Sequence, residues 1–258
     1  MATFLFDELI FGPVKSRRLG VSLGINLLPV DNKYCTFNCV YCECGWTELK
    51  DKKIILPKRS EFKQKLETKL KELQGTENEP DAITFAGNGE PTIHPDFDAI
   101  IDDTIAARDA FAPKAKISVL SNASQLHKKR VKEALKKVDK NIQKLDAGTN
   151  EMFQRINQPL GDLSLSQIVD KLLSFQGKLI IQTLFIRGNY NGKPIDNTTE
   201  EEISSWLEII KKVNPEYVMI YPIDRDTPAK NLIKIQKEEL DKIAERVNEA
   251  GIKTEVYY

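Results

Sequence analysis

The chain has 258 residues, a formal net charge of +0, 29% charged residues and 41% hydrophobic residues. This length can bury a sizeable core, and the composition is that of an ordinary soluble globular protein. The balanced charge excludes a strong overall basic field that would gather nucleic acid or anionic lipid.

The N-terminal segment is apolar but interrupted by Asp7 and Glu8. No basic region precedes it, and no apolar run in the chain approaches the roughly 18 residues of a membrane span. We therefore expect a cytoplasmic protein with no signal peptide and no membrane partner. A predicted turn at Gly12-Pro13 leads to Arg17 and Arg18, which are either an anion contact at an active-site mouth or a solvated surface pair.

Residues 19–30 predict the first strand, because apolar side chains alternate along it. The loop that follows carries Cys35, Cys39 and Cys42 in the spacing C-x3-C-x2-C. Three thiolates on one loop could hold a four-iron cluster and leave one iron without a protein ligand. The alternatives are a zinc knot or three buried thiols, although zinc usually takes four ligands in paired C-x2-C spacing. We interpret Cys44 as a bystander, since one further thiol cannot build a second cluster.

A helix over residues 59–73 and a strand over 81–86 are predicted next. The strand runs directly into Gly87-Asn-Gly89-Glu90-Pro. The glycines let the backbone approach a ligand closely, and the Glu90 carboxylate could accept hydrogen bonds from a ligand ammonium group. The alternative is a β-to-α turn with a capping acid.

The third predicted strand, residues 116–120, ends in Ser121 and Asn122 and is followed by a helix from about 124 to 137. The two small polar side chains could bind a ribose hydroxyl pair. Alternatively, Asn122 or Ser124 merely caps the next helix.

The fourth predicted strand, residues 141–146, has Lys144 and Asp146 on the same face. We expect both to point into a barrel interior near its mouth. Burying such a pair without partners is costly, which favours a polar ligand nearby and makes both residues catalytic candidates. The alternative is a structural ion pair.

The remaining chain continues the same alternation. Helical residues are expected over 149–176 with an interruption at 157–161, and a buried strand over 177–185 has Gln182 as its one polar exception, which could reach a cofactor or substrate. Residues 187–194 are interpreted as a loop and a candidate substrate lid. The last predicted elements are helix 199–213, strand 216–221, helix 235–249 and strand 252–258.

Six strand-then-helix units predict an α/β fold with parallel winding, a partial (β/α)6 TIM-like barrel with the cysteine loop after strand 1. The C-terminal end of a first parallel strand is where such barrels place their chemistry. No composition break or long linker divides the chain. We therefore expect one domain over 1–258, with a core of about 19–228 and a C-terminal helix and strand over 229–258.

The cysteine spacing, with an aromatic residue just before the third cysteine, resembles the radical S-adenosylmethionine (radical SAM) superfamily. GPVKSRRLG and GNGEP resemble a subgroup that includes the tRNA wyosine-base synthases. The resemblance implies a [4Fe-4S] cluster on the three cysteines and SAM on its open iron. It also implies reductive cleavage of SAM to methionine and a 5′-deoxyadenosyl radical, which abstracts hydrogen from an unknown substrate.

The resemblance further places the SAM amine near Gly87, Gly89 and Glu90, its ribose near Ser121 and Asn122, and the strand of Lys144 and Asp146 beside SAM. Tyr41 could pack its ring against the adenine. A one-electron donor such as flavodoxin or ferredoxin is an expected partner.

The substrate is left open between a small molecule, a protein and RNA. Wyosine-type enzymes carry a second cluster on additional cysteines, which Cys44 alone cannot supply, and activases that install a glycyl radical share the cysteine spacing. The non-enzymatic alternative is an iron–sulfur electron carrier or metal-binding module, which needs neither the Gly87–Glu90 turn nor Ser121-Asn122.

Overall fold

The computed structural model describes residues 4–16, 19–48 and 54–258, so Arg17 and Arg18 lie outside the described residues. Its main sheet has eight strands in the order β1-β2-β3-β4-β5-β6-β9-β11. β1 pairs with β2 in antiparallel fashion, and every other pairing in this sheet is parallel. The strands are β1 (Ile10–Ser16), β2 (Gly20–Ile25), β3 (Ala82–Phe85), β4 (Lys116–Ser121), β5 (Lys140–Lys144), β6 (Ile180–Leu184), β9 (Tyr217–Tyr221) and β11 (Thr254–Val256).

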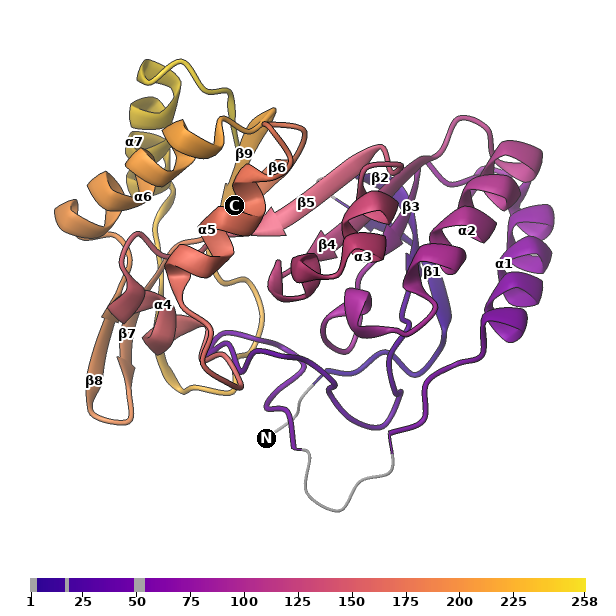
Figure 1. Cartoon of the computed structure of the whole chain (residues 1–258), viewed down its shortest axis with the longest axis horizontal. Coiled ribbons are helices and arrows are strands. Elements are labelled where there is room, and N and C mark those ends of the chain that lie inside the picture. The colour runs from indigo at the N-terminus through magenta and orange to yellow at the C-terminus, as the bar shows by residue number, and fades with distance from the viewer. Residues whose placement is uncertain (1–3, 17–18, 49–53) are drawn as a thin grey trace.

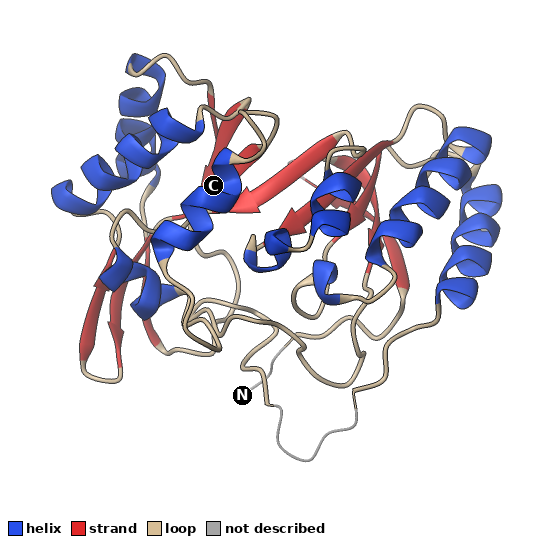
Figure 2. Cartoon of the chain, in the orientation of Figure 1, coloured by secondary structure: helices blue, strands red, loops and turns tan. Residues whose placement is uncertain are grey.

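The helices flank this curved sheet in two groups (Figures 1 and 2). α1, α2 and α3 cover the half that contains β2 to β4, and α5, α6 and α7 cover the other half. The α-helices are α1 (Arg59–Leu73), α2 (Phe97–Phe111), α3 (Lys129–Leu135), α4 (Asn150–Ile156), α5 (Leu165–Leu173), α6 (Glu200–Val213) and α7 (Lys237–Glu249), and two 3-10 helices are η1 (Pro91–Ile93) and η2 (Ser124–His127).

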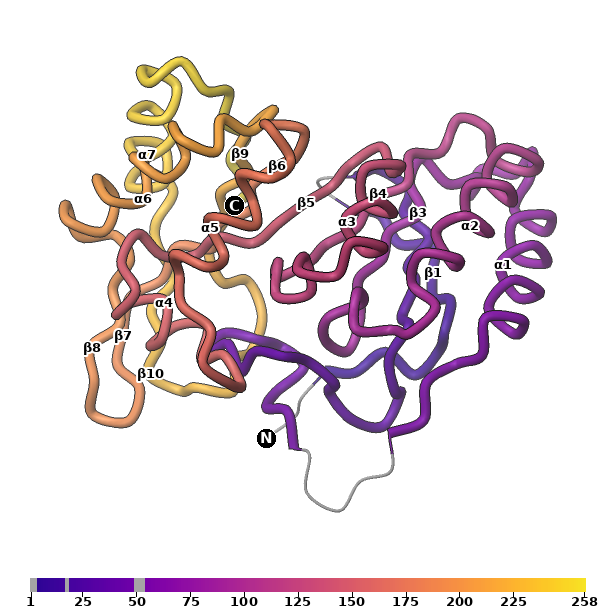
Figure 3. Tube along the Cα trace, viewed as in Figure 1, coloured from indigo at the N-terminus to yellow at the C-terminus, as the bar shows by residue number. Residues whose placement is uncertain are grey.

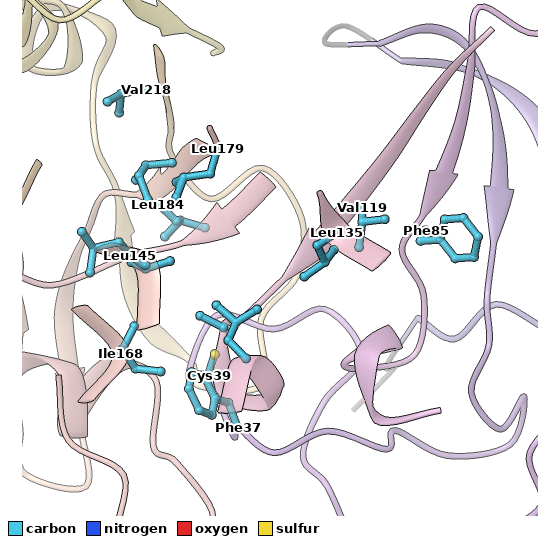
Figure 4. Packing of buried hydrophobic residues seen from close by; sticks show 14 of the residues in the cluster. Phe37, Cys39, Phe85, Val119, Leu135, Leu145, Ile168, Leu179, Leu184 and Val218 are labelled. Atoms are coloured by element: carbon cyan, nitrogen blue, oxygen red, sulfur yellow. The ribbon is translucent and has the colours of Figure 1, made fainter. Parts of the chain in front are cut away.

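The predicted partial barrel is confirmed: in the part of the chain that the structure describes, β1 and β11 are the two edges of the sheet and do not pair with each other. The parallel strands are buried, as the apolar runs predicted, and every residue of β3 and β6 is buried. Figure 4 shows the core side chains of the two halves, with Phe37 and Cys39 of the cysteine loop between them. No helix among the described residues is both long and apolar enough to cross a membrane.

The loop predicted over 187–194 was wrong, because these residues form a small second sheet. β7 (Ile186–Tyr190) and β8 (Lys193–Asp196) make a hairpin, and β10 (Asn231–Lys234) pairs with β7. Asn191 and Gly192 form the connection, both with positive φ (51° and 75°). An Asn-Gly pair with this backbone matches the right-handed twist of a hairpin, so the local sequence carried a strand signal.

The turn predicted at Gly12-Pro13 was also wrong, because both residues lie within β1. β1 is an edge strand with a register shift between Phe11 and Val14. An edge strand and an irregular pairing both tolerate a proline, which has no N–H to donate to a neighbouring strand. The helix expected from 124 to 137 is divided into η2 and α3 because Lys128 has an extended backbone.

Asn197 joins the two sheets with three short hydrogen bonds. Its Nδ2 donates to the carbonyl oxygens of Asp146 and Leu184, both at 2.8 Å, and its Oδ1 accepts from the Ile186 N–H at 2.7 Å. Only 2% of Asn197 is exposed, so water cannot replace these bonds.

We expect Asn197→Ala to lower the free energy of unfolding by about 1–3 kcal/mol, because it leaves buried backbone groups without partners. Chemical denaturation measures this change. The control Asn78→Ala, in an exposed loop, should stay within about 0.5 kcal/mol of the unsubstituted protein. Equal effects of the two substitutions would contradict this role of Asn197.

Candidate functional site

A cavity of about 600 Å³ lies between the cysteine loop and the carboxyl ends of the parallel strands. The cysteine loop crosses beneath both halves of the sheet (Figure 3). The candidate metal, cofactor and catalytic residues named from the sequence all line this cavity, with the exception of Asp146. These residues are Cys35, Cys39, Tyr41, Cys42, Gly87, Gly89, Glu90, Ser121, Asn122, Lys144 and Gln182.

The four cysteines are free thiols and all border the cavity. Two amide groups approach the sulfur atoms: Asn122 Nδ2 lies 3.6 Å from Cys35 Sγ, and Asn157 Nδ2 lies 3.5 Å from Cys39 Sγ. Across the described ranges, no three His, Cys, Asp or Glu side chains are grouped to hold a single metal ion. This arrangement is compatible with a cubane cluster, in which each thiolate ligates its own iron.

Lys33, which no sequence pattern singles out, is buried beside these cysteines. It is 3% exposed, and its Nζ donates to the carbonyl oxygen of Gly45 at 2.9 Å. Burial alone would lower the Lys33 pKa, but the negative charge of the Cys42, Cys35 and Cys39 thiolates raises it overall. Lys33 therefore contributes one fixed positive charge to a site that collects thiolates. In the sequence it looks like any surface lysine, since a single charged residue does not reveal its burial.

The thiols themselves differ in acidity. Burial raises the Cys35 pKa to about 12 and also raises the Cys39 pKa. A hydrogen bond from Cys44, together with the charge of Lys33, lowers the Cys42 pKa to about 6 despite burial. Cys44 thus contacts a candidate ligand and is not a remote bystander, and its own thiol lies 3.5 Å from the Gly87 carbonyl oxygen.

The Gly87–Glu90 turn packs directly against the cysteine loop. Gly89 has φ = +141°, and a Cβ atom there would lie 1.9 Å from the Tyr34 carbonyl oxygen, so only glycine fits. Glu90 is buried, and its carboxylate accepts from the Thr92 N–H at 3.1 Å, the Asn122 N–H at 2.6 Å and the Thr92 hydroxyl. Burial raises the Glu90 pKa against these bonds. The capping alternative is therefore present, and the same carboxylate also faces the cavity.

Ser121 and Asn122 form the next part of the cavity wall. The Asn122 side chain donates to the Thr36 hydroxyl at 3.0 Å and accepts from the Ser124 N–H at 3.0 Å. Ser121 Oγ accepts from the Ala123 N–H at 3.2 Å. These bonds shape the turn into η2, but the N-cap of η2 is Ala123, without a side-chain cap hydrogen bond, so the capping alternative is not what the structure shows. They still leave both residues on the cavity surface.

Lys144 and Asp146 lie together, but only Lys144 lines the cavity. Their Nζ and Oδ1 atoms are 3.6 Å apart. The Asp146 carboxylate lies behind the wall, fully buried, where it accepts from Asn157 Nδ2 at 2.8 Å, the Leu184 N–H at 2.9 Å and the Tyr41 hydroxyl. Asp146 is thus a satisfied acceptor that holds its neighbours in place.

The Lys144 ammonium group is enclosed by aromatic rings. Its Nζ lies 4.9 Å from the Tyr41 ring centre and 5.1 Å from that of Tyr221, and it donates to the Tyr221 hydroxyl. Burial alone would lower the Lys144 pKa, but Asp146 and then Tyr221 raise it overall. Lys144 therefore presents a stable cation to the cavity. Tyr221, at the end of β9, was not found from the sequence.

Comparison with known proteins identifies the family of this site. The profile of the radical SAM superfamily matches residues 31–172, more than half of the chain. The chain belongs to the radical SAM superfamily. A UPF0026 protein of Helicobacter pylori is 33% identical over 240 residues, which are 90% of this chain and 71% of that protein. A Brachyspira hyodysenteriae protein named GTPase Obg is 30% identical over 251 residues, 96% of this chain, and the chain spans only 34% of that protein.

Two solved structures have the same fold at low sequence identity. Streptococcus suis SuiB bound to S-adenosylmethionine superposes with a TM-score of 0.63 and 15% identity, over 88% of this chain and 49% of SuiB. An archaeal TYW1 superposes with a TM-score of 0.52 and 15% identity, over 88% of this chain and 71% of TYW1. The chain thus spans about half the length of SuiB.

Radical SAM proteins use a [4Fe-4S] cluster and SAM, and the donor set of this cavity fits both groups. Three thiols could each ligate one iron and leave the fourth open. Lys33 offsets part of the negative charge of such a cluster, and the Gly87–Glu90 turn offers an acceptor for an ammonium group.

We expect Cys42→Ser to lose the cluster, because a hydroxyl does not replace a thiolate as an iron ligand. Cys44→Ser should keep it. After anaerobic reconstitution, iron and sulfide analysis should give about four irons per chain for Cys44→Ser and far fewer for Cys42→Ser. If Cys44→Ser lost as much iron as Cys42→Ser, Cys44 would itself be a ligand.

A second prediction concerns the charge of Lys144. Because its folded-state pKa is raised above that of the unfolded chain, the stabilisation from its partners is fully present at neutral pH. It is lost only as the pH rises through the folded-state pKa. In NMR spectra of lysine labelled at Cε, the signal that Lys144→Arg removes should stay unchanged up to pH 10. Asp146→Asn should shift its titration to lower pH. A midpoint below pH 9 in the unsubstituted protein would make Lys144 an amine nucleophile instead.

Proposed function

We propose that this chain is a radical SAM enzyme that cleaves SAM reductively and uses the product to abstract hydrogen from a bound substrate. The observation that carries the proposal is the convergence of three free thiols, a buried cation and the Gly87–Glu90 turn on one cavity. When bound, the cluster and SAM supply methionine and a 5′-deoxyadenosyl radical by transfer of one electron. The protein supplies binding, orientation and exclusion of water.

Cys35, Cys39 and Cys42 would hold the cluster in this proposal. The buried Glu90 carboxylate already accepts hydrogen bonds from Thr92, Asn122 and the Ser121 side chain, and it would hold the SAM ammonium group by its negative charge. Gly87 and Gly89, which both precede Glu90, line the cavity without side chains and would let SAM come close to the turn.

Ser121 and Asn122 would contact the ribose, and Gln182 on β6 would contact SAM or substrate from the opposite wall. In the sheet, Gln182 is paired with Lys144 across β5 and β6, so the two side chains enter the cavity side by side. Tyr41 already packs its ring against Lys144, and this limits its contact with adenine to the remaining part of the ring.

Lys144 would act as a cation that positions an anionic group, such as a carboxylate or phosphate, beside the cluster. Its raised pKa and its contact with Asp146 oppose a role as a base. Asp146 is then a positioning residue. The cavity of about 600 Å³ is within the usual range for small-molecule sites, so SAM and the reacting part of a substrate can occupy it together.

The test is SAM cleavage by the reconstituted protein under anaerobic conditions. With dithionite, the protein should release 5′-deoxyadenosine and methionine in equal amounts. Glu90→Gln should weaken SAM binding about 10- to 100-fold, because a charge-assisted hydrogen bond contributes about 1.5–3 kcal/mol. Isothermal titration calorimetry measures this change.

Glu77→Gln, in an exposed loop, is the matched control and should bind SAM like the unsubstituted protein. Thermal unfolding of each variant checks that the Thr92 and Asn122 contacts survive. A protein that takes up iron and sulfide but releases no 5′-deoxyadenosine would be an electron carrier and not an enzyme.

A further inference from the structure

A second cavity, of about 310 Å³, lies on the other side of the cysteine loop. Thr36 and Phe37 form part of its wall, and Phe37 also borders the larger cavity. The first half of the cysteine loop therefore separates the two cavities. The remaining wall comes from η2, from the segment between α4 and α5, and from α5 itself.

A short chain of hydrogen bonds connects this outer cavity to Cys35. Asn122 Nδ2 lies 3.6 Å from Cys35 Sγ and 3.0 Å from the Thr36 hydroxyl. The Thr36 hydroxyl is in turn 2.7 Å from the Ser124 hydroxyl. Thr36 and Ser124 both line the outer cavity, so two hydrogen-bonded steps separate its wall from a candidate cluster ligand.

A run of basic residues begins at the wall of the outer cavity. His127 and Lys171 line it, and Asp162 is the only acidic residue among its lining residues. Directly after His127 the chain reads Lys128-Lys129-Arg130, followed by Lys132. Lys129 and Arg130 are exposed at the start of α3, and none of these four cations forms a salt bridge with an acidic residue in the described part of the chain. The surface formed by residues 127–132 and Lys171 is here called the basic rim.

We propose that the basic rim is the docking surface for an acidic one-electron donor protein of the flavodoxin type. The inference rests on the proposed function, which requires one electron per SAM cleaved. The transfer changes no bonds: the donor loses one electron, and the iron–sulfur group gains it. Complementary charge would bring the donor to the outer cavity, whose wall includes Thr36 and Phe37, the two residues that directly follow Cys35 in the cysteine loop.

The position of the basic rim favours a redox protein over RNA. The outer cavity beside the rim shares, among its lining residues, only Phe37 with the cavity that contains Lys144 and Glu90, where a substrate would have to react. An RNA bound there would be separated from the reacting atoms by the loop itself. An electron, in contrast, can pass from a docked protein to the iron–sulfur group through the loop.

The test is the double charge reversal Lys129→Glu/Arg130→Glu in the full-length, reconstituted protein. Both residues are exposed at a helix N-terminus, where acidic side chains are favourable, so the fold should tolerate the change. Lys211→Glu/Lys212→Glu, at the exposed C-terminal end of α6 on the other half of the sheet, is the matched control.

We expect the double reversal at α3 to slow cluster reduction by reduced flavodoxin at least tenfold at low salt and to weaken binding of oxidised flavodoxin similarly. The control should change neither. The difference should shrink in high salt, because the Debye length falls from about 10 Å at 0.1 M to about 3 Å at 1 M. Dithionite-driven release of 5′-deoxyadenosine should be the same in all three proteins.

The docking proposal would be wrong if both double variants lost flavodoxin-dependent reduction equally. It would also be wrong if the α3 variant lost none of it. Loss of tRNA binding at α3 with unchanged reduction by flavodoxin would likewise overturn it. Failure of the proposed function is distinguishable, since it would appear as no 5′-deoxyadenosine with dithionite in the unsubstituted protein, whereas flavodoxin binding is measured without turnover.

Discussion

The contact between Tyr34 and Gly89 is the constraint on which the site depends. The Tyr34 N–H donates to the Asn88 carbonyl oxygen at 2.8 Å, and the Glu90 N–H donates to the Tyr34 carbonyl oxygen at 3.2 Å. These bonds fix the start of the cysteine loop on the Gly87–Glu90 turn, and the approach is so close that no side chain fits at Gly89. The thiols and the Glu90 carboxylate are thereby held at one cavity, although they are about 50 residues apart in the sequence.

The other end of the loop is held by a different half of the molecule. The Asn38 and Val40 N–H groups donate to the carbonyl oxygens of Gln158 and Ile156, at 3.0 and 2.9 Å. The cysteine loop therefore bridges the two halves of an open sheet, and Phe37 and Cys39 lie between the two groups of core side chains in Figure 4. Burial of the loop disfavours the charged thiolate form of its cysteines, because it removes them from water. Lys33 and the amide groups of Asn122 and Asn157 offset part of this effect.

Most of the features that depend on short stretches of sequence were predicted correctly. The C-x3-C-x2-C spacing, the glycines before Glu90 and the alternation of buried strands with helices were sufficient for the parallel sheet and for most of the cavity wall. The β7–β8 hairpin was missed although Asn191-Gly192 is a strong hairpin signal, because the glycine and asparagine content was interpreted as a loop. β1 was missed because Pro13 is compatible with a strand only at an edge, and an edge is a property of the whole sheet.

The remaining site residues depend on partners that are distant in sequence. Nothing near Lys33 indicates its burial, and nothing near Asp146 indicates that Asn157 and Leu184 use its carboxylate. The prediction that Lys144 and Asp146 lie together came from strand periodicity and agrees with their separation of 3.6 Å. Periodicity cannot predict that one of them faces the cavity and the other lies behind its wall, because that difference is set by the strands on either side.

The open sheet allows the cysteine loop to be reached from two directions. The larger cavity extends past Tyr221 to Phe6 and Phe11 near one edge of the sheet and to Tyr257 near the other. In the proposed function, a substrate would enter between the edge strands β1 and β11 without displacing the cysteine loop. The outer cavity adjoins the opposite surface of that loop, at Thr36 and Phe37. If the sheet closed into a full barrel, the substrate could not reach the cysteine loop between β1 and β11. In the proposed function, the missing closure would give the substrate its own entrance, and an electron donor at the basic rim would not compete with it.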